Sequence, residues 1–157
     1  MASRKIEDLS LDLQKIYFKF KEKMDIAKIP FVTTCTARLV KEQYALYAQG
    51  RQTLAEVNTL RKLAGLYEIK DADNKIVTWT MNSKHVIDLE DSDIKNDKAK
   101  AFDIAILKDG KVTWDIKVNV NNNELADYIE AGKIGESVGL KWGGRFKSPD
   151  YPHYEVI

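Results

Sequence analysis

The sequence predicts a single α+β domain in which a small, mainly antiparallel sheet is flanked by helices. Three observations predict this class. Apolar residues recur at helical spacing through most of the first 65 residues. Two β-rich runs then meet at Asp109-Gly110, a dipeptide that strongly favours a β-hairpin. A helical stretch and a short β-rich segment follow, and no linker or repeat divides the range 1–157.

The first half of the chain is predicted to be largely helical. An amphipathic helix ends before Pro30, because its apolar residues recur at steps of three and four. These residues are Ile6, Leu9, Leu13, Ile16, Phe20 and Met24. The run FVTTCTA (31–37) is rich in β-branched residues, so we expect a buried strand. Two further helices are expected in 38–50 and 51–65, each closed by a glycine.

The second half is predicted to supply most of the sheet. IVTWTM (76–81) is expected to be a short strand, and 86–100 an exposed acidic and polar excursion. The hairpin covers 100–116. A helix with an asparagine cap near its start is expected in 122–140, followed by a strand in HYEVI at 153–157.

Composition excludes several classes of protein. The 25 basic and 24 acidic residues leave a net charge of +1, whereas nucleic-acid binding needs a concentrated basic excess. No apolar run reaches 18 residues, so we expect no membrane span and no stable membrane association. The N-terminus has no apolar signal-peptide core, which predicts synthesis in the cytoplasm. Cys35 is the single cysteine and cannot form an intramolecular disulfide, so we expect it to be a buried core residue. We also expect the protein to be a monomer.

The candidate chemistry is a metal site. A catalytic zinc needs three protein ligands and one open position, and His85 and His153 are the only histidines. Asp103 lies in the apolar run KAFDIAI, where a carboxylate is costly to bury unless it is paired or binds an ion. Strand alternation could instead turn Asp103 to solvent, and both histidines could be polar loop residues. The residue types alone leave both interpretations open.

An ordered series of short motifs favours the metal. SKH (83–85), AFD (101–103), WGG (142–144) and DYPHYE (150–155) resemble the zinc D-alanyl-D-alanine carboxypeptidase and L-alanyl-D-glutamate peptidase family of cell-wall enzymes, the VanY-like peptidases, many of which are phage endolysins. The family pattern Ser-x-His-x-x-Gly-x-Ala-x-Asp is matched at Ser83, His85, Ala101 and Asp103, and Asp/Glu-x-x-His at Asp150 and His153. TARLVKEQYALYAQGR (36–51) resembles the family's arginine-bearing strand-to-helix junction, with Arg38, Gln43 and Arg51 in register.

Two departures from the family pattern affect the assignment. The first histidine and the aspartate are usually seven residues apart but are eighteen apart here, because VIDLEDSDIKNDKAK (86–100) intervenes. Asp88, Asp91 and Asp93 are therefore rival ligands, and Asp103 is preferred because it keeps the Ala-x-Asp signature. The second departure is Arg145-Phe146, which is expected to alter the substrate groove but not the metal site.

The resemblance implies a role for each matched residue. One zinc ion per chain would be held by His85, Asp103 and His153. Asp150 would be the general base and Arg38 the cation that stabilises the oxyanion; the alternatives are a Pro-Asp turn for Asp150 and a surface ion pair for Arg38, with Arg51 as the rival cation. The substrate-binding residues implied are Ser83, Gln43 and Trp142.

The function implied is a zinc-dependent peptidase that cleaves the peptidoglycan stem peptide, between L-alanine and D-glutamate, as a phage endolysin. One catalytic domain, 1–157, with no separate wall-binding domain would act on the cell wall after release from the host cytoplasm. A D-Ala-D-Ala carboxypeptidase or dipeptidase is the alternative that uses the same ligands. A non-catalytic wall-binding domain is the alternative from another class.

Overall fold

The computed structural model describes residues 2–157. Its main sheet is antiparallel throughout, with strand order β1-β4-β7-β6 and β5 paired to the outer half of β4. The strands are β1 (Phe31–Cys35), β4 (Ala101–Lys108), β5 (Lys111–Thr113), β6 (Leu140–Trp142) and β7 (His153–Val156). The predicted α+β class with a mainly antiparallel sheet is confirmed, and so is the hairpin that turns at Asp109-Gly110.

Two helices, α1 (Leu11–Ile26) and α4 (Asp127–Ser137), share one core with the sheet. On α1 the predicted apolar stripe is buried at Leu13, Phe20 and Met24, while Ile6 and Leu9 lie before the helix. Phe20 lies 4.9 Å from Tyr154 between ring centroids. Tyr154 in turn stacks on Phe102 at 5.4 Å. Because side chains alternate along a strand, the neighbours of Phe102 and Tyr154 project from the opposite face of the sheet. Side chains on that opposite face can therefore contribute to a functional site.

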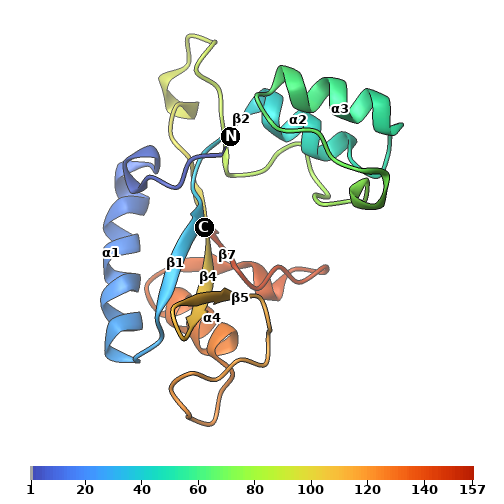
Figure 1. The fold of residues 1–157 in the computed structure, drawn as a ribbon. Coiled ribbons are helices and arrows are strands. Elements are labelled where there is room, and N and C mark those ends of the chain that lie inside the picture. The colour runs from blue at the N-terminus through green and yellow to red at the C-terminus, as the bar shows by residue number, and fades with distance from the viewer. Residues whose placement is uncertain (1) are drawn as a thin grey trace.

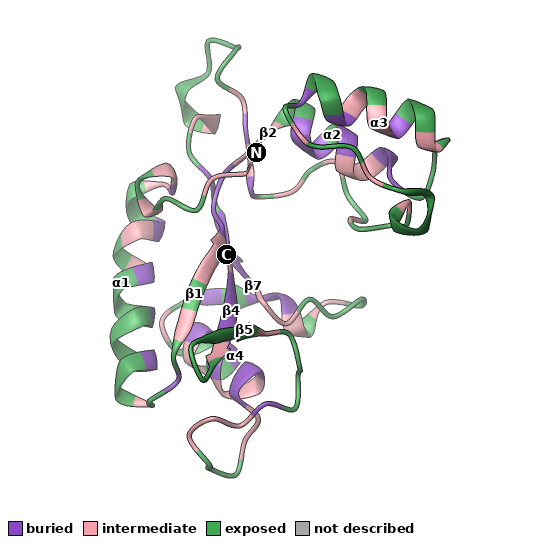
Figure 2. Ribbon diagram, in the orientation of Figure 1, coloured by how far each residue is buried: buried purple, intermediate pink, exposed green. Residues whose placement is uncertain are grey.

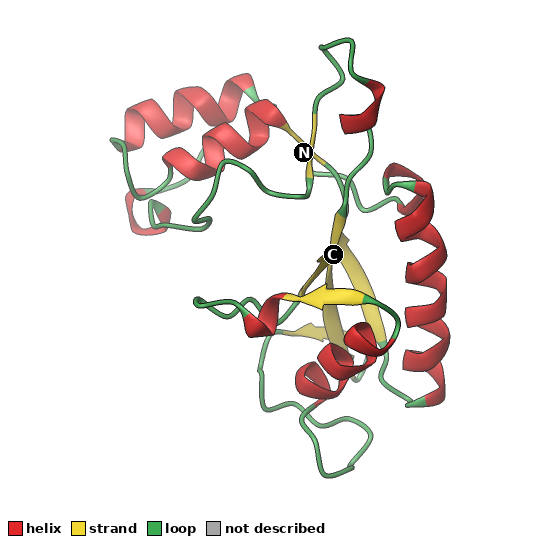
Figure 3. Ribbon diagram, turned by 180° about the vertical axis from the view of Figure 1, so that it is seen from behind, coloured by secondary structure: helices red, strands yellow, loops and turns green. Residues whose placement is uncertain are grey.

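A second layer is formed by α2 (Val40–Ala48) and α3 (Leu54–Leu63), which stand apart from the sheet in both views (Figures 1 and 3). Gly50 and Gly65 follow these helices at positive φ, as expected for helix ends. Two short parallel strands, β2 (Arg38–Leu39) and β3 (Val86–Ile87), join this layer to the rest of the molecule.

Several sequence predictions were wrong in detail. Residues 76–81 form no strand; the backbone oxygens of Thr78 and Thr80 accept hydrogen bonds from side chains of the α2 region instead of from a partner strand. The prediction of an asparagine cap is also wrong, because the N-cap residue of α4 is Ala126 and it makes no side-chain capping hydrogen bond. β1 is half-exposed rather than buried along most of its length. Strand β6 was not predicted.

The excursion predicted after His85 is real and is mostly exposed (Figure 2). It contains β3 and a single 3-10 turn, Ile94–Asn96. Its base is closed, because the backbone N–H of Lys100 donates to the carbonyl of Lys84 at 2.8 Å. The chain therefore leaves and rejoins the body of the protein at nearly the same point. Within residues 2–157, no helix has the length and hydrophobicity to cross a bilayer.

Candidate active site

Three side chains of the types that bind metals converge on the face of the sheet opposite Phe102 and Tyr154. Asp103 on β4 and His153 on β7 are direct partners in the antiparallel register, so their side chains emerge side by side. Phe102 and Tyr154, their neighbours, point into the core. His85 arrives from the segment before β3 and is 3% exposed. The topology thus brings together residues that are 18 and 50 positions apart.

The donor atoms form a small triangle. His85 Nε2 and His153 Nδ1 each lie 3.0 Å from Asp103 Oδ1, and the two nitrogens lie 3.2 Å apart. Zinc bonds of about 2.0–2.1 Å in tetrahedral geometry would set the ligand atoms about 3.4 Å apart. Two imidazoles and one carboxylate are also a donor set that zinc takes in hydrolases. The three side chains therefore fit a zinc ion with little movement.

The far side of each imidazole is held by a second partner. Nδ1 of His85 lies 2.8 Å from the backbone oxygen of Thr36, and Nε2 of His153 lies 2.8 Å from Glu155 Oε2. A ring N–H donates in each bond, so the other nitrogen of each ring faces the triangle and is the one available to a metal ion. Metal-binding histidines are commonly oriented in this way.

The triangle is electrostatically suited to a cation. Burial lowers the pKa of His85, but hydrogen bonds with Asp103 and Cys35 outweigh it and raise the pKa to about 10. Burial also opposes ionisation of Asp103, yet hydrogen bonds from His153 and His85 hold its pKa well below the usual range. The Asp103 carboxylate therefore stays ionised beside the two imidazoles, and its negative charge would attract a cation.

Cys35 provides an alternative donor. Its sulfur, His85 and Asp103 offer ligand atoms that all lie within 4.8 Å of one another. However, the His85 nitrogen that the sulfur contacts, at 3.6 Å, is Nδ1, which is already bonded to Thr36. The triangle with His153 is tighter and uses the ring nitrogens that face away from Thr36 and Glu155, so it is the better candidate for a metal site. The expectation that Cys35 is buried agrees with its 6% exposure.

The rival acids of the excursion lie in turns of their own loop. Asp93 Oδ1 accepts the N–H of Lys95, and Asp91 Oδ1 accepts the N–H of Asp93. Asp88 likewise accepts the N–H of Glu90. The structure therefore brings Asp103, rather than any of these acids, to the two histidines.

Arg38 and Gln43 form a linked pair beside the site. Arg38 donates to Gln43 Oε1 at 2.8 Å and to the sulfur of Cys35 at 3.6 Å. Gln43 is fully buried, and its amide donates to the Thr80 backbone oxygen at 2.7 Å. Arg38 is thus fixed at the cavity wall, with Gln43 behind it as its support.

Asp150 lies on the loop just before β7. Its N–H donates to the Gly143 carbonyl at 2.8 Å, and its own carbonyl accepts the N–H of His153 at 3.2 Å. A Cβ at Gly143 would lie 2.4 Å from that carbonyl oxygen, so only glycine permits this approach. Burial and the charge of Asp103 raise the pKa of the Asp150 carboxyl, which moves it toward the range of a general base.

These groups surround one cavity of about 470 Å³. Of the residues predicted from sequence, it is lined by Arg38, Ser83, His85, Asp103, Asp150 and His153. Phe146 lines it as well. Trp142 does not: it is 4% exposed, and its indole N–H donates to the Tyr151 carbonyl at 2.9 Å. Arg145 also points elsewhere and pairs with Glu136 on α4.

Sequence reasoning missed Glu155 and the segment 77–80. Glu155 is two residues beyond His153 on the same strand, so the period of two along a strand could have placed both on one face. Residues 77–80 form a wall of the cavity. No sequence signal indicated this, because the segment is held there by contacts with residues more than 25 positions away.

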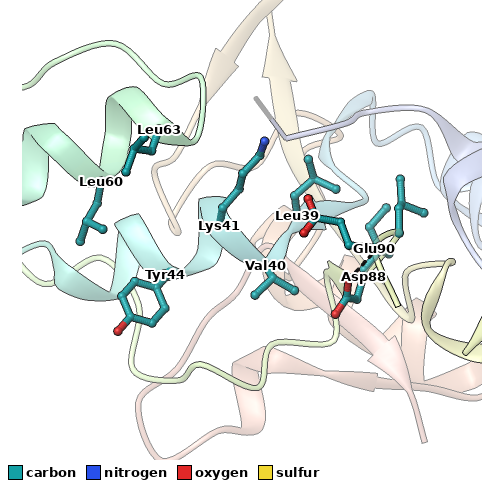
Figure 4. Close-up of a pocket in the computed structure, with 10 residues that line it drawn as sticks. Leu39, Val40, Lys41, Tyr44, Leu60, Leu63, Asp88 and Glu90 are labelled. Atoms are coloured by element: carbon teal, nitrogen blue, oxygen red, sulfur yellow. Dashed lines mark hydrogen bonds between the residues drawn. The ribbon is translucent and has the colours of Figure 1, made fainter. Parts of the chain in front are cut away.

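A second cavity, of about 490 Å³, lies between the helical layer and the excursion. Figure 4 shows Leu60 and Leu63 from α3, Tyr44 and Lys41 from α2, and Asp88 and Glu90 on the far side. Its lining contains no histidine or cysteine. The donor atoms needed for metal-dependent chemistry are therefore found in the first cavity.

Comparisons with known proteins identify similar cell-wall enzymes. A family model described as D-alanyl-D-alanine carboxypeptidase matches residues 98–156. The peptidoglycan L-alanyl-D-glutamate endopeptidase CwlK of Bacillus subtilis (strain 168) is 41% identical over 59 residues. That alignment covers 36% of this chain and 35% of CwlK, so the chain spans about a third of that relative.

Among solved structures, the L-Ala D-Glu endopeptidase ChiX of Serratia marcescens is similar in fold, with a TM-score of 0.50 and 14% sequence identity. The alignment covers 100% of the present chain and 89% of the ChiX chain. At that identity the likeness concerns the fold. The matched range 98–156 includes Asp103, Asp150 and His153. The resemblance drawn from the sequence is therefore confirmed over residues 98–156, which match the model of the D-alanyl-D-alanine carboxypeptidase family.

Proposed function

We propose that this protein is a zinc-dependent peptidase that cleaves the stem peptide of peptidoglycan between L-alanine and D-glutamate. The observation that carries the proposal is the triangle of His85, Asp103 and His153, with donor atoms 3.0–3.2 Å apart in an open cavity. The bond is chosen because CwlK, which shares 41% identity over 59 residues, is named for that activity.

The residues of the triangle would hold the ion. When bound, zinc supplies Lewis-acid chemistry, activating water and polarising the scissile carbonyl. Glu155 and the Thr36 carbonyl keep the two imidazoles in the orientation that the ion requires.

Asp150 is the proposed general base. It lies at the same cavity and its pKa is raised by burial and by Asp103. Its carboxylate would accept the proton of the attacking water and then pass it to the nitrogen of the leaving amine. Because the backbone of Asp150 is hydrogen-bonded to both Gly143 and His153, the acid keeps a fixed place relative to a ligand.

Arg38 is the proposed electrostatic partner of the carbonyl oxygen. Its guanidinium lines the cavity while Gln43 and Cys35 fix its two terminal nitrogens. A preorganised cation at this wall would stabilise the negative charge that develops on the oxygen during attack. Ser83, whose hydroxyl accepts the N–H of His85 at 3.3 Å, would order the segment that carries the first ligand.

The biological role we propose is lysis of a bacterial host as a phage endolysin. In this role a monomer, formed by one catalytic domain over 1–157, is made in the host cytoplasm and reaches the wall after release. The resemblance of the ordered motifs to endolysins supports it. A second candidate activity is removal of the terminal D-alanine, which the description of the matching family favours.

The decisive experiment identifies the products. Purified peptidoglycan is incubated with the protein, with and without a chelator, and new termini are determined by mass spectrometry. We expect new D-glutamate amino termini, lost with chelator, and a fall in rate of about 10²–10⁴ in Asp150→Asn with zinc content retained. Asp93→Asn is the matched control. Free D-alanine would favour the second candidate, and no cleavage by zinc-loaded protein would exclude both activities.

A further inference from the structure

Trp79 is unusually exposed for a tryptophan in a fixed loop. The residue is 70% exposed, yet its neighbours on both sides are anchored. Gln43 donates to the Thr78 hydroxyl at 3.2 Å and to the Thr80 backbone oxygen at 2.7 Å. Arg51 donates to the Thr78 backbone oxygen at 3.1 Å. The indole is therefore held out into solvent by a segment that does not collapse around it.

Arg51 also supports the indole directly. Its guanidinium lies 3.9 Å from the ring centroid of Tyr47 and 5.9 Å from that of Trp79, within the range of cation–π contacts. It is tied down by a 2.6 Å hydrogen bond to the Tyr47 backbone oxygen. One side of the indole is thus braced, while most of its surface stays available to a ligand.

The position of Trp79 connects it to the proposed chemistry. Trp79 lines the same cavity as His85 and Asp103, and Phe146 and Lys147 line that cavity from another segment. The other lining residues from the same segment are mostly polar and include Thr78, Thr80, Asn82 and Lys84. An amphipathic ring amid hydroxyl, amide and ammonium groups suits a ligand that has both an apolar face and many hydroxyls.

A sugar ring has this character, and the substrate supplies one. In peptidoglycan the L-alanine of the stem peptide is joined through a lactyl group to N-acetylmuramic acid. Cleavage between L-alanine and D-glutamate therefore takes place one residue away from this sugar. We propose that Trp79 forms a saccharide-binding subsite and that its indole stacks against this N-acetylated sugar. The inference rests on the proposed function.

Kinetics on two matched substrates test the subsite. One is the disaccharide bearing the stem peptide, and the other is the same peptide without sugar. Removing one stacking contact in Trp79→Ala should lower kcat/KM for the sugar-bearing substrate by about tenfold and leave the free peptide nearly unchanged. Trp79→Phe should retain most of the activity. Trp114→Ala removes a tryptophan that is 56% exposed beyond β5 and should change neither substrate.

A binding measurement separates this inference from the proposed function. The chain has three tryptophans, at 79, 114 and 142, so the indole N–H region of an NMR spectrum should hold three side-chain signals. Titration with the free disaccharide should shift the signal that Trp79→Ala removes and leave the other two in place. An unshifted signal, or equal losses on both substrates, would overturn the subsite. Failure of the wild type to cleave either peptide, with the shift intact, would overturn only the peptidase.

Discussion

At the scale of single residues, hydrogen-bond partners orient the two histidines toward the triangle. His153 could present either ring nitrogen, and the 2.8 Å bond between its Nε2 and Glu155 selects Nδ1 for the triangle. Lys84 and Lys141 lie 3.7 and 3.9 Å from the other oxygen of Glu155 and favour its ionised form. Glu155 is thus a positioning residue, one step removed from the ion.

Glu155→Gln should weaken zinc binding. The amide keeps the shape of the side chain but loses the charge that fixes and polarises the imidazole, and loss of such a partner typically costs about 10–100-fold in metal affinity. Competition with a chromophoric chelator measures the dissociation constant. Glu136→Gln, on α4 and paired with Arg145, is the control. Equal affinity in Glu155→Gln and the wild type would contradict this role.

The sequence was informative at this scale where a residue belongs to a short motif. His85, Asp103, His153 and Asp150 were named from the motifs, and the structure places all four at one cavity. Trp142 was expected in the substrate site but is buried. Trp79 was passed over because nothing in IVTWTM shows which side chain the fold will leave exposed. Motif order located the donors, whereas the cavity wall depends on distant tertiary contacts.

At the scale of elements, Arg145 has a structural partner instead of a place in the cleft. Its guanidinium donates to both carboxylate oxygens of Glu136, at 2.8 and 3.2 Å, which ties the 3-10 turn Gly143–Arg145 to α4. That turn carries the Gly143 carbonyl, to which Asp150 is hydrogen-bonded. The ion pair therefore supports the loop of the proposed base from outside the site.

This pair should give a measurable pH dependence. The hydrogen bond from Arg145 holds the pKa of Glu136 below its ordinary value, so the pair stabilises the fold above a pH of about 4.3, the usual glutamate pKa. The contribution is lost as the pH falls through the lower folded-state value. The difference in unfolding free energy between wild type and Arg145→Gln should be small and should shrink from pH 6 to pH 3.

Chemical denaturation across that pH range measures the difference. Lys62→Gln removes an exposed cation from α3 and serves as the control. The difference in unfolding free energy between this variant and the wild type should not shrink from pH 6 to pH 3 in the same way. The contact of Arg145 with the Trp142 ring, at 5.6 Å, is lost in the same variant but does not titrate with Glu136. If the difference in unfolding free energy between the wild type and Arg145→Gln widens toward pH 3, the stabilising role of the Arg145–Glu136 pair is contradicted.

Elements with strong local signals were predicted well, and those defined by distant partners were not. Asp109-Gly110 determines its own turn, and the stripe of α1 determines its own face. In contrast, β6 has three residues and exists because Leu140 to Trp142 pair with β7. Residues 76–81 have strand-forming composition, yet side chains from α2 and the segment after it take up the backbone oxygens that a partner strand would use.

At the scale of the whole molecule, the proposed ion would add a further link between the main sheet and the segment that leads into the helical layer. Asp103 and His153 belong to the main sheet, while His85 directly precedes β3, whose partner β2 leads into the helical layer. Occupation of the triangle would therefore fasten the sheet to the segment that supports α2 and α3. Stability of the whole chain should depend on zinc.

Zinc at 100 times its dissociation constant should stabilise the fold by about 2.7 kcal/mol. For a chain of this size, about 2–4 °C per kcal/mol corresponds to an increase in Tm of roughly 5–10 °C, measured by calorimetry with added zinc and with chelator. Asp103→Ala should lose the increase, and Asp93→Ala should keep it. The reverse pattern would assign the third ligand to the excursion, and no increase in the wild type would argue against a zinc site.

The excursion also explains where the family match begins. The matching range starts at residue 98, just after the acidic and polar residues that separate His85 from Asp103. The first histidine thus falls outside the aligned stretch although it lies 3.0 Å from the aspartate. His85 and Asp103 stay close in space despite the residues between them, because the hydrogen bond from Lys100 to Lys84 closes the base of the loop.

That closed base makes the loop a site for grafting. Doubling the length of a flexible loop costs only about 0.6 kcal/mol in closure entropy, and neither end of this one can drift while the Lys84–Lys100 hydrogen bond is intact. A foreign peptide spliced in near Asp93 would leave the three donors where they are and would be displayed away from the sheet. Lengthening the chain at this point would add a new recognition module to the protein without rebuilding its centre.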